Sequence, residues 1–142
     1  MEILNASSIN DLCKSVVFEN TRWRVGDDKF SAHRYVMVIV QYTDKINSQK
    51  LNAFIRERET VQRSKKMFNM RVTTSEVALD LTGFSPGGIN PFGITQSMPI
   101  IITENISRLN CMFLGAGHLD WKVACNVNEF VQKTGCHVVD LA

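Results

Sequence analysis

The sequence lacks the features that mark several large classes of protein. It has three prolines and four cysteines in 142 residues, and no two cysteines are spaced as a CxxC pair. A disulfide framework and a zinc knuckle are therefore both disfavoured, and reduced thiols in the core are expected. No apolar run is long enough to cross a bilayer, and the first residues do not form a signal peptide. These absences predict a cytoplasmic protein with no membrane partner.

The chain also lacks a strong excess of charge of either sign. Its 16 Lys and Arg against 14 Asp and Glu give a net charge of +2, far below what a dedicated duplex-binding protein carries. Any contact with nucleic acid must therefore be local. The densest basic run comprises Arg56, Arg58, Arg63, Lys65 and Lys66, with Glu57 and Glu59 interrupting it. Such a run is either a solvated helix face or an edge that contacts phosphates without reading their sequence.

What the sequence does contain is enough apolar residues, 44% of the chain, for the core of one globular domain. Runs rich in β-branched residues predict strands, and capped amphipathic runs predict helices. Strands are predicted at 15–19 with a lead-in from 12, and at 34–42, 66–70, 98–102, 111–114, 121–125 and 138–139. Helices are predicted at 49–58, 75–82 and 126–133. Because strands outnumber helices and do not alternate regularly with them, we expect one α+β domain, residues 1–142, with a mixed sheet.

One stretch, residues 83–93, stands out as GFSPGGINPFG. It holds four of the eight glycines and two of the three prolines. Glycine permits positive φ and close approach of the backbone to a ligand, while proline stiffens the segment. The stretch is either a tight turn without a ligand or a binding loop. In the second case the N–H groups of Gly87, Gly88 and Ile89 would donate to a carbonyl or to a developing oxyanion.

Two side chains are weaker candidates for a catalytic nucleophile. Residues 83–87 match the G-x-S-x-G elbow around Ser85, but the next residue is Pro86, which has no N–H to offer an oxyanion hole. Cys13 stands beside Lys14, which favours a thiolate, yet adjacent side chains of a strand point to opposite faces. A serine- or thiol-dependent hydrolase is therefore the third choice of function.

The order of three signals along the chain resembles a known family. A lysine opens the first strand in CKSVVF at 13–18, LTGF at 81–84 ends the second helix, and GGINPFG follows at 87–93. In this order the chain resembles the YbaK-like family of prolyl-tRNA-synthetase-associated editing domains, from about Lys14 to Leu141. The strand at 99–102 and the turn Gly115-Ala116-Gly117 also fall in family order. The resemblance implies a mostly antiparallel, barrel-like sheet flanked by short helices.

The resemblance implies an aminoacyl-tRNA deacylase, which hydrolyses the ester between a wrong amino acid and the terminal adenosine of a tRNA. It implies no metal and no other cofactor, and its partners would be misacylated tRNA and an aminoacyl-tRNA synthetase. Lys14 would engage the substrate near the scissile ester, and the backbone of Gly87 and Gly88 would face the carbonyl. Backbone amides stabilise a tetrahedral oxyanion, and attack would come from water or from a group of the substrate.

The resemblance further assigns a set of residues to substrate binding: Ser15, Ile89, Pro91, Gly93, Gly115, His118 and Asp120. His118 is either an acid or base of the pocket or a solvated loop histidine. The chain departs from the family pattern in two places. Only thirteen residues precede Lys14, where a longer helical segment is usual, and the polar segment 20–33 is longer than the usual turn. These departures leave an alternative, a non-catalytic module that binds tRNA or a synthetase.

Overall fold

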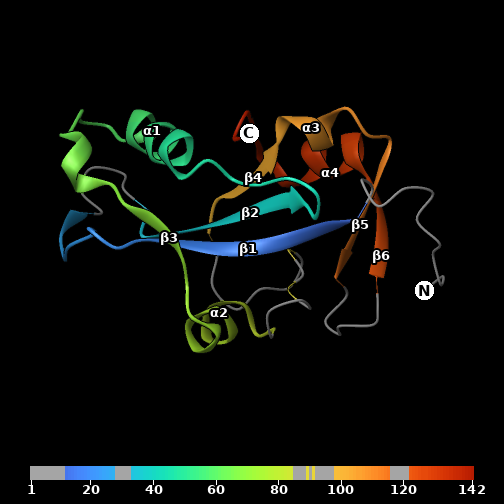
Figure 1. Cartoon of the computed structure of the whole chain (residues 1–142), viewed down its shortest axis with the longest axis horizontal. Helices are drawn as coiled ribbons and strands as arrows, with labels where there is room; N and C mark the ends of the chain where they lie inside the picture. Colours follow the sequence, from blue (N-terminus) through green and yellow to red (C-terminus); the bar gives the residue numbers. More distant parts are fainter. Residues whose placement is uncertain (1–11, 28–32, 85–88, 90, 92–97, 116–121) are drawn as a thin grey trace.

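The fold is built on a five-stranded mixed sheet with the strand order β3-β1-β2-β4-β7. The computed structural model describes residues 12–27, 33–84, 89, 91, 98–115 and 122–142 (Figure 1). The strands of the sheet are β1 (Cys13–Asn20), β2 (Tyr35–Gln41), β3 (Met70–Val72), β4 (Ile100–Thr103) and β7 (His137–Val139). β1 is antiparallel to β2 and to β3, whereas β2 with β4 and β4 with β7 are parallel pairs.

An antiparallel hairpin of β5 (Cys111–Gly115) and β6 (Lys122–Asn126) completes the described strands. It lies at the start of β1, where Leu12 bridges to Phe113 (Figure 1). Three of the five strand pairings are antiparallel, and the described strands do not close into a barrel. The α+β class and the mixed, mostly antiparallel sheet are as the sequence predicts.

Three of the four described α-helices begin at a residue whose side chain caps the first turn. The helices are α1 (Ser48–Arg58), α2 (Ser75–Thr82), α3 (Glu104–Ser107) and α4 (Val127–Thr134), with a 3₁₀ turn η3 (Lys65–Met67). The Asn47 side chain accepts from the N–H groups of Gln49 and Lys50 at 3.0 and 3.2 Å, which satisfies two free donors of the first turn of α1. Gly83 and Gly135, with φ of 80° and 63°, end α2 and α4 in the left-handed conformation. None of the described helices is long and apolar enough to cross a membrane.

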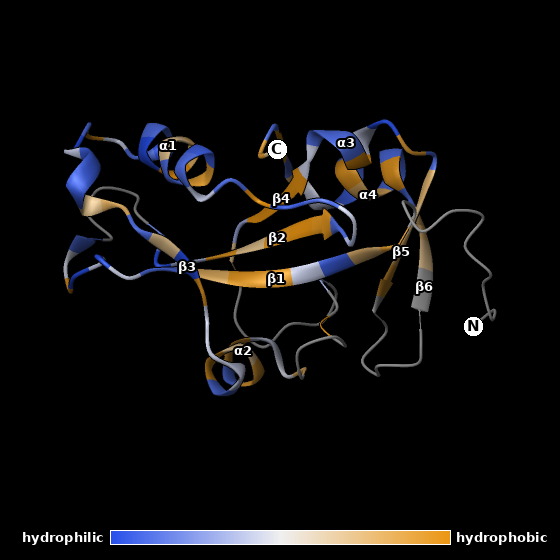
Figure 2. Ribbon diagram, in the orientation of Figure 1, coloured by the Kyte–Doolittle hydropathy of each residue, from blue (hydrophilic) through white to orange (hydrophobic). Residues whose placement is uncertain are grey.

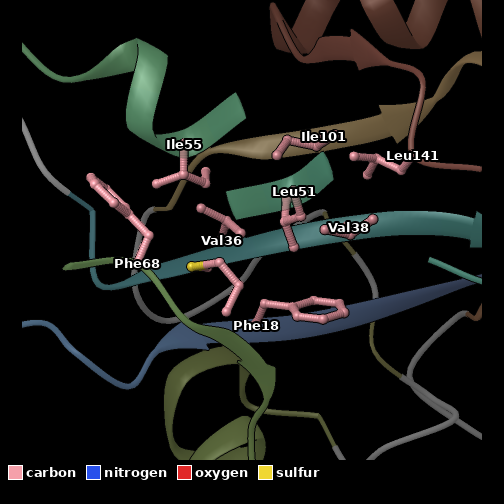
Figure 3. Close-up of a cluster of buried hydrophobic side chains, with 9 residues drawn as sticks. Phe18, Val36, Val38, Leu51, Ile55, Phe68, Ile101 and Leu141 are labelled. Atoms are coloured by element: carbon pink, nitrogen blue, oxygen red, sulfur yellow. The ribbon is translucent and has the colours of Figure 1, made fainter. Parts of the chain in front are cut away.

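Most residues of the two central strands are hydrophobic (Figure 2), and buried clusters lie on both faces of these strands. Alternate residues of a strand share a face, and helices α1 and α2 lie on opposite sides of β1 and β2 (Figure 1). Phe18, Val36 and Val38 face α1, where they pack with Leu51 and Ile55 (Figure 3). On the other face, Val17 and Met37 pack with Ala78 and Leu81 of α2. Any side chain of β1 is therefore assigned to one face or the other.

A further core cluster fills the space toward the hairpin. Cys13 and Ile39 pack there with Ile106 of α3, Phe130 of α4 and Met112 of β5. Cys13 and Ile39 share the face of Val17 and Met37 by alternation. All four cysteines are free, as expected from their spacing.

One predicted strand differs from the elements observed. The strand expected at 66–70 is replaced by η3 and the three-residue β3, because Ser64 caps a turn by accepting from the N–H of Lys66 at 3.3 Å. The polar segment 20–33, expected to be a hairpin excursion or an extended loop, connects the antiparallel strands β1 and β2, and the Asn20 N–H donates to the Arg34 carbonyl at 2.7 Å. There the Asn20 side chain accepts from Asn69 N–H and donates to the Met67 carbonyl, both at 3.0 Å.

Candidate functional site

Lys14 lies near the start of β1 with its side chain on the α1 side of the sheet. It stands opposite Val40 in the β1–β2 register, and it shares its face with Val16 and Phe18 because alternate residues point the same way. The side chain is partly buried. Its Nζ lies 5.8 Å from the centroid of the Tyr42 ring, within the range of a cation–π contact. The charge is thus held beside an aromatic surface.

Lys14 lines a hollow of about 540 Å³ between β1, β3 and the chain that connects β2 to α1. This volume falls within the range of small-ligand pockets. The lining residues are Lys14, Val16, Phe18, Val40, Asp44, Lys45, Ile46, Ser48, Met70, Arg71 and Val72. Most of the wall is apolar, with a few polar groups, which is the usual composition of a ligand pocket. One of these groups, Asp44, accepts a hydrogen bond of 2.9 Å from Asn105 and is fixed by it.

Ser15, the neighbour of Lys14, lies on the opposite face of the sheet. It pairs with Ile39 and is only 8% exposed. Its Oγ is buried and makes no hydrogen bond within the part of the chain that the structure describes. Burying a hydroxyl without a hydrogen-bond partner costs free energy. The Ser15 hydroxyl is therefore a candidate to form a hydrogen bond with a ligand or with another group outside the described residues. Ser15 therefore belongs to the α2 face of β1, away from the Lys14 hollow.

Hydrogen bonds at the end of α2 fix the direction in which the glycine-rich stretch begins. The Thr82 hydroxyl donates to the Ala78 carbonyl at 2.7 Å and accepts from the Phe84 N–H at 3.1 Å. Together with the left-handed Gly83, this fixes the direction in which the chain departs. Farther along, Ile89 is 5% exposed and packs with Val17 and Met37. The described part of the stretch is therefore anchored on the α2 face.

The structure separates the predicted site residues into two groups. Lys14 faces α1, whereas Ser15 and Ile89 face the opposite side, and the buried Pro91 follows Ile89 by two residues. Gly115 ends β5, opposite Lys122 of β6. The predictions for Gly87, Gly88, Gly93, His118 and Asp120 fall outside the described residues. Within the described chain, Lys14 is not brought together with the glycine-rich stretch.

Several residues in or beside the hollow were not predicted from the sequence. Asp44 and Lys45 line the hollow and Tyr42 contacts Lys14, and these residues, which follow the end of β2, lie near Lys14 because β1 and β2 are paired in antiparallel register. The structure shows different surroundings for the residues of the basic run at 56–66. Arg63 forms ion pairs with Glu59 and Asp27, whereas Arg56 and Lys65 line a second hollow beside α1. The signal available for Tyr42 was alternation along the strand expected at 34–42, which places Tyr42 on the same face as Val40, the partner of Lys14.

The thiols and the metal-ligand residues offer no competing centre in the described chain. Cys13 is fully buried in the core. Burial raises the pKa of the Cys125 and Cys136 thiols, which disfavours their reactive thiolate form. Over residues 12–27, 33–84, 89, 91, 98–115 and 122–142, no three His, Cys, Asp or Glu side chains gather as a metal site would require.

The sequence matches the model of one family of domains. Residues 3–133 match the aminoacyl-tRNA editing domain. No curated protein gives a significant match to the chain. The family match spans β1, the Lys14 hollow and the glycine-rich stretch, so both groups of candidate residues lie inside it.

Several solved structures are similar to the chain as a whole. One is a scaffold protein used for the computational grafting of epitopes, with a TM-score of 0.74 at 17% identity, covering 96% of this chain and 76% of that one. A candidate trans-editing enzyme for prolyl-tRNA synthetase has a TM-score of 0.73 at 19% identity, covering 94% and 71%. A hypothetical protein, APE2540, has a TM-score of 0.73 at 14% identity, covering 94% and 75%. At these identities the likeness shows a shared fold.

Proposed function

The chain belongs to the aminoacyl-tRNA editing domain family, and from this membership we propose that it is an aminoacyl-tRNA deacylase that acts in trans. The substrate is a misacylated tRNA, and the bond hydrolysed is the ester between the amino acid and the terminal adenosine. The observation that carries the proposal is the family match over residues 3–133. The Lys14 hollow supports it, because its volume of about 540 Å³ suits an aminoacyl group.

In this proposal Lys14 supplies the positive charge of the site. Hydrolysis of an ester by water places negative charge on the carbonyl oxygen in the tetrahedral transition state. An ammonium group already held at that position stabilises the charge, and apolar walls strengthen the interaction by excluding water. Val16, Phe18 and Val40 form such walls around Lys14. No side-chain nucleophile is needed, since water attacks directly.

The second part of the proposal concerns the backbone of the glycine-rich stretch. Gly87 and Gly88 are proposed as N–H donors to the carbonyl, with Ser15, Ile89, Pro91, Gly93, Gly115, His118 and Asp120 shaping the amino-acid site. This part is supported by the motif and by the unpartnered Ser15 hydroxyl. It is separable from the Lys14 part, because Ser15 and Ile89 lie on the other face of the sheet.

That separation also favours a second candidate function, a non-catalytic module that binds tRNA or a synthetase. A hydrolytic site needs its charge and its oxyanion donors within hydrogen-bond reach of one carbonyl. The described residues place the Lys14 side chain and Ile89 on opposite faces. Tight binding of tRNA or of a synthetase, with no release of amino acid from any misacylated tRNA, would favour the module over the enzyme.

The decisive experiment incubates the protein with a panel of tRNAs, each charged with a wrong amino acid, and measures the amino acid released. Lys14→Ala should lower the rate by about 100-fold, the usual effect of removing one group that stabilises an oxyanion. Lys133→Ala is the matched control, since Lys133 forms only an exposed pair with Glu129 at 3.5 Å on α4. Circular dichroism should show that both variants fold. An unchanged rate for Lys14→Ala in an active protein would remove Lys14 from the mechanism.

A further inference from the structure

Two sets of described cations differ in their partners and their places. Arg34, Arg63, Arg108, Lys50 and Lys133 each form an ion pair with a carboxylate. Lys14, Lys45, Arg56, Lys65 and Arg71 form no ion pair within the described residues, and all five line one of the two hollows. The two hollows thus hold five cations, although the net charge of the chain is only +2. Such charge is available to an anionic ligand.

The second hollow continues this site along α1. It measures about 350 Å³ and is lined by Gln49, Asn52, Ala53, Arg56, Lys65 and Phe68. The four helical residues recur at the spacing of a single helix face, so one side of α1 forms one wall. The Arg56 Nε donates to the Arg63 carbonyl at 2.6 Å, which fixes the base of the guanidinium group. The two outer nitrogens of Arg56 have no hydrogen-bond partner among the described residues and can bind a ligand. Planar guanidinium groups suit phosphate oxygens.

The two hollows are neighbours, because Met70, which lines the Lys14 hollow, is hydrogen-bonded to Asn52, which lines the second hollow. The hydrogen bond of 2.8 Å from the Met70 N–H to the Asn52 side chain stands between them and joins the helix to β3. On one side of this bond lie Arg56 and Lys65, and on the other lie Lys14 and Lys45. We call the two hollows together the α1 groove. From Gln49 to Arg56 its helical wall runs roughly 10 Å, at 1.5 Å per residue.

The lining of the α1 groove distinguishes among anionic ligands. Five cations spread along the two hollows, Arg71 among them, suit a chain of separate phosphates better than one compact anion. Asp44 is the one carboxylate among the lining residues of the two hollows, and it is held by Asn105. Tyr42 is 42% exposed and lies beside Lys14, where a base can stack on its ring. Charge along a groove together with an exposed aromatic ring is the pattern of single-stranded nucleic acid binding.

We propose that the α1 groove holds the single-stranded 3′ end of the tRNA, with the terminal base on Tyr42 and the preceding phosphates at Lys45, Arg56 and Lys65. The identity of the RNA rests on the proposed function, whereas the binding mode rests on the groove. Arg56 and Lys65 are positioning residues, because they contact phosphates upstream of the ester. The arrangement delivers the aminoacyl end into the hollow that Lys14 lines.

The test measures binding of uncharged tRNA by fluorescence anisotropy over a range of salt concentrations. Arg56→Gln with Lys65→Gln should weaken binding by tenfold or more and reduce the slope of log K against log salt by about 1.4, because each lost single-strand phosphate contact removes about 0.7. Lys65→Gln alone should reduce it by about 0.7, and since Lys65 is exposed this variant is expected to fold. Arg108→Gln with Lys133→Gln is the control of equal charge, and it should bind like the wild type.

Two further binding measurements decide which part of the RNA occupies the groove. A tRNA trimmed to a blunt acceptor end should bind the wild type as weakly as the intact tRNA binds the double variant. Tyr42→Leu should weaken binding of the intact tRNA by about tenfold, the usual effect of losing one stacked base. Equal affinities and equal salt slopes for the groove variants and the control would overturn the proposal. So would undiminished binding of the blunt tRNA.

A comparison of substrates separates this inference from the proposed function. In an active enzyme, the double variant should lower kcat/KM for misacylated tRNA relative to kcat/KM for an aminoacyl ester of adenosine, which carries no upstream phosphates. The control pair should leave that ratio unchanged. If the wild type hydrolyses neither substrate, the deacylase proposal fails, and the binding measurements still decide the groove.

Discussion

At the scale of single residues, Arg63 is the most constrained charge in the described chain. Its guanidinium lies 2.6 Å from Glu59 and 3.3 Å from Asp27, and the three side chains are 9%, 2% and 10% exposed. The Arg63 cation also lies 5.1 Å from the centroid of the Phe68 ring. The hydrogen bonds that the Arg63 guanidinium donates to the Glu59 carboxylate are the largest cause that raises the pKa of Arg63, so the group stays charged. This cluster joins the end of α1 to the segment that follows β1.

Replacing Arg63 should therefore destabilise the protein severely. Arg63→Met should lower the free energy of unfolding by about 3–5 kcal/mol, because it leaves Glu59 and Asp27 buried without a counter-charge. Arg108→Met is the comparison, since Arg108 pairs with Glu104 at 3.3 Å in an exposed position, and its loss should cost less than about 1 kcal/mol. Urea unfolding of both variants measures the difference. Equal losses would show that the cluster contributes nothing beyond an ordinary surface pair.

The residue scale also shows a limit of reading the site from the sequence. Lys14 and Ser15 were both assigned to one site, yet neighbouring residues of a strand point to opposite faces. The same rule was applied to Cys13 and Lys14 and was correct there. The residues that complete the hollow, such as Asp44 and Lys45, depend on the register of β1 with β2. That register follows from long-range packing, which no local pattern contains.

At the scale of elements, the contact of α1 with β7 carries a titratable group. His137 of β7 stacks against Phe54 of α1 with ring centroids 5.5 Å apart, and its Nε2 lies 3.5 Å from the Arg58 guanidinium. Burial is the main cause that lowers the pKa of His137 below 6.5, followed by the charges of Arg58 and His33. Protonation of this histidine therefore opposes the packing of α1 on the edge of the sheet.

This contact predicts how stability depends on pH. Because the pKa of His137 is lower in the folded than in the unfolded state, the unfolded state binds more protons in the interval between the two values. The stability that the neutral histidine contributes is full above about 6.5 and is lost as the pH falls through that interval toward the folded pKa. Unfolding measured from pH 7.5 to 5 should show a smaller loss for His137→Gln than for the wild type. Parallel curves for the two proteins would exclude His137 as a source of the pH dependence.

Elements with strong end signals were predicted well. α2 occupies residues 75–82 as predicted, because Thr74 caps its start and Gly83 ends it. The run at 66–70 was read as a strand from its apolar residues, yet Ser64 starts a 3₁₀ turn there and β3 begins only at Met70. The four-residue α3 was missed, since Thr103 makes no side-chain cap and so few residues carry no periodicity. Local chemistry thus determines helices with caps, and tertiary context decides the short elements.

At the scale of the whole molecule, the sheet divides the candidate site residues between two faces. The α1 face carries Lys14 and the α1 groove, and the α2 face carries Ser15 and Ile89. The sequence places both sets within one family domain, because all of them lie along residues 3–133. It does not tell which set meets the substrate. A measurement over the whole backbone can decide between the faces.

Hydrogen exchange with and without a non-hydrolysable aminoacyl-tRNA analogue provides that measurement. If the substrate occupies the α1 groove, amide exchange should slow by several-fold in residues 42–50 and 65–72, because these exposed segments line it. The centre of β2, buried and paired on both sides, should already exchange slowly and change little. The segment around α2 serves as the internal control, since it packs on the opposite face. Slower exchange at 75–84 alone would place the substrate on the α2 face and would remove Lys14 from the site, because its side chain faces α1.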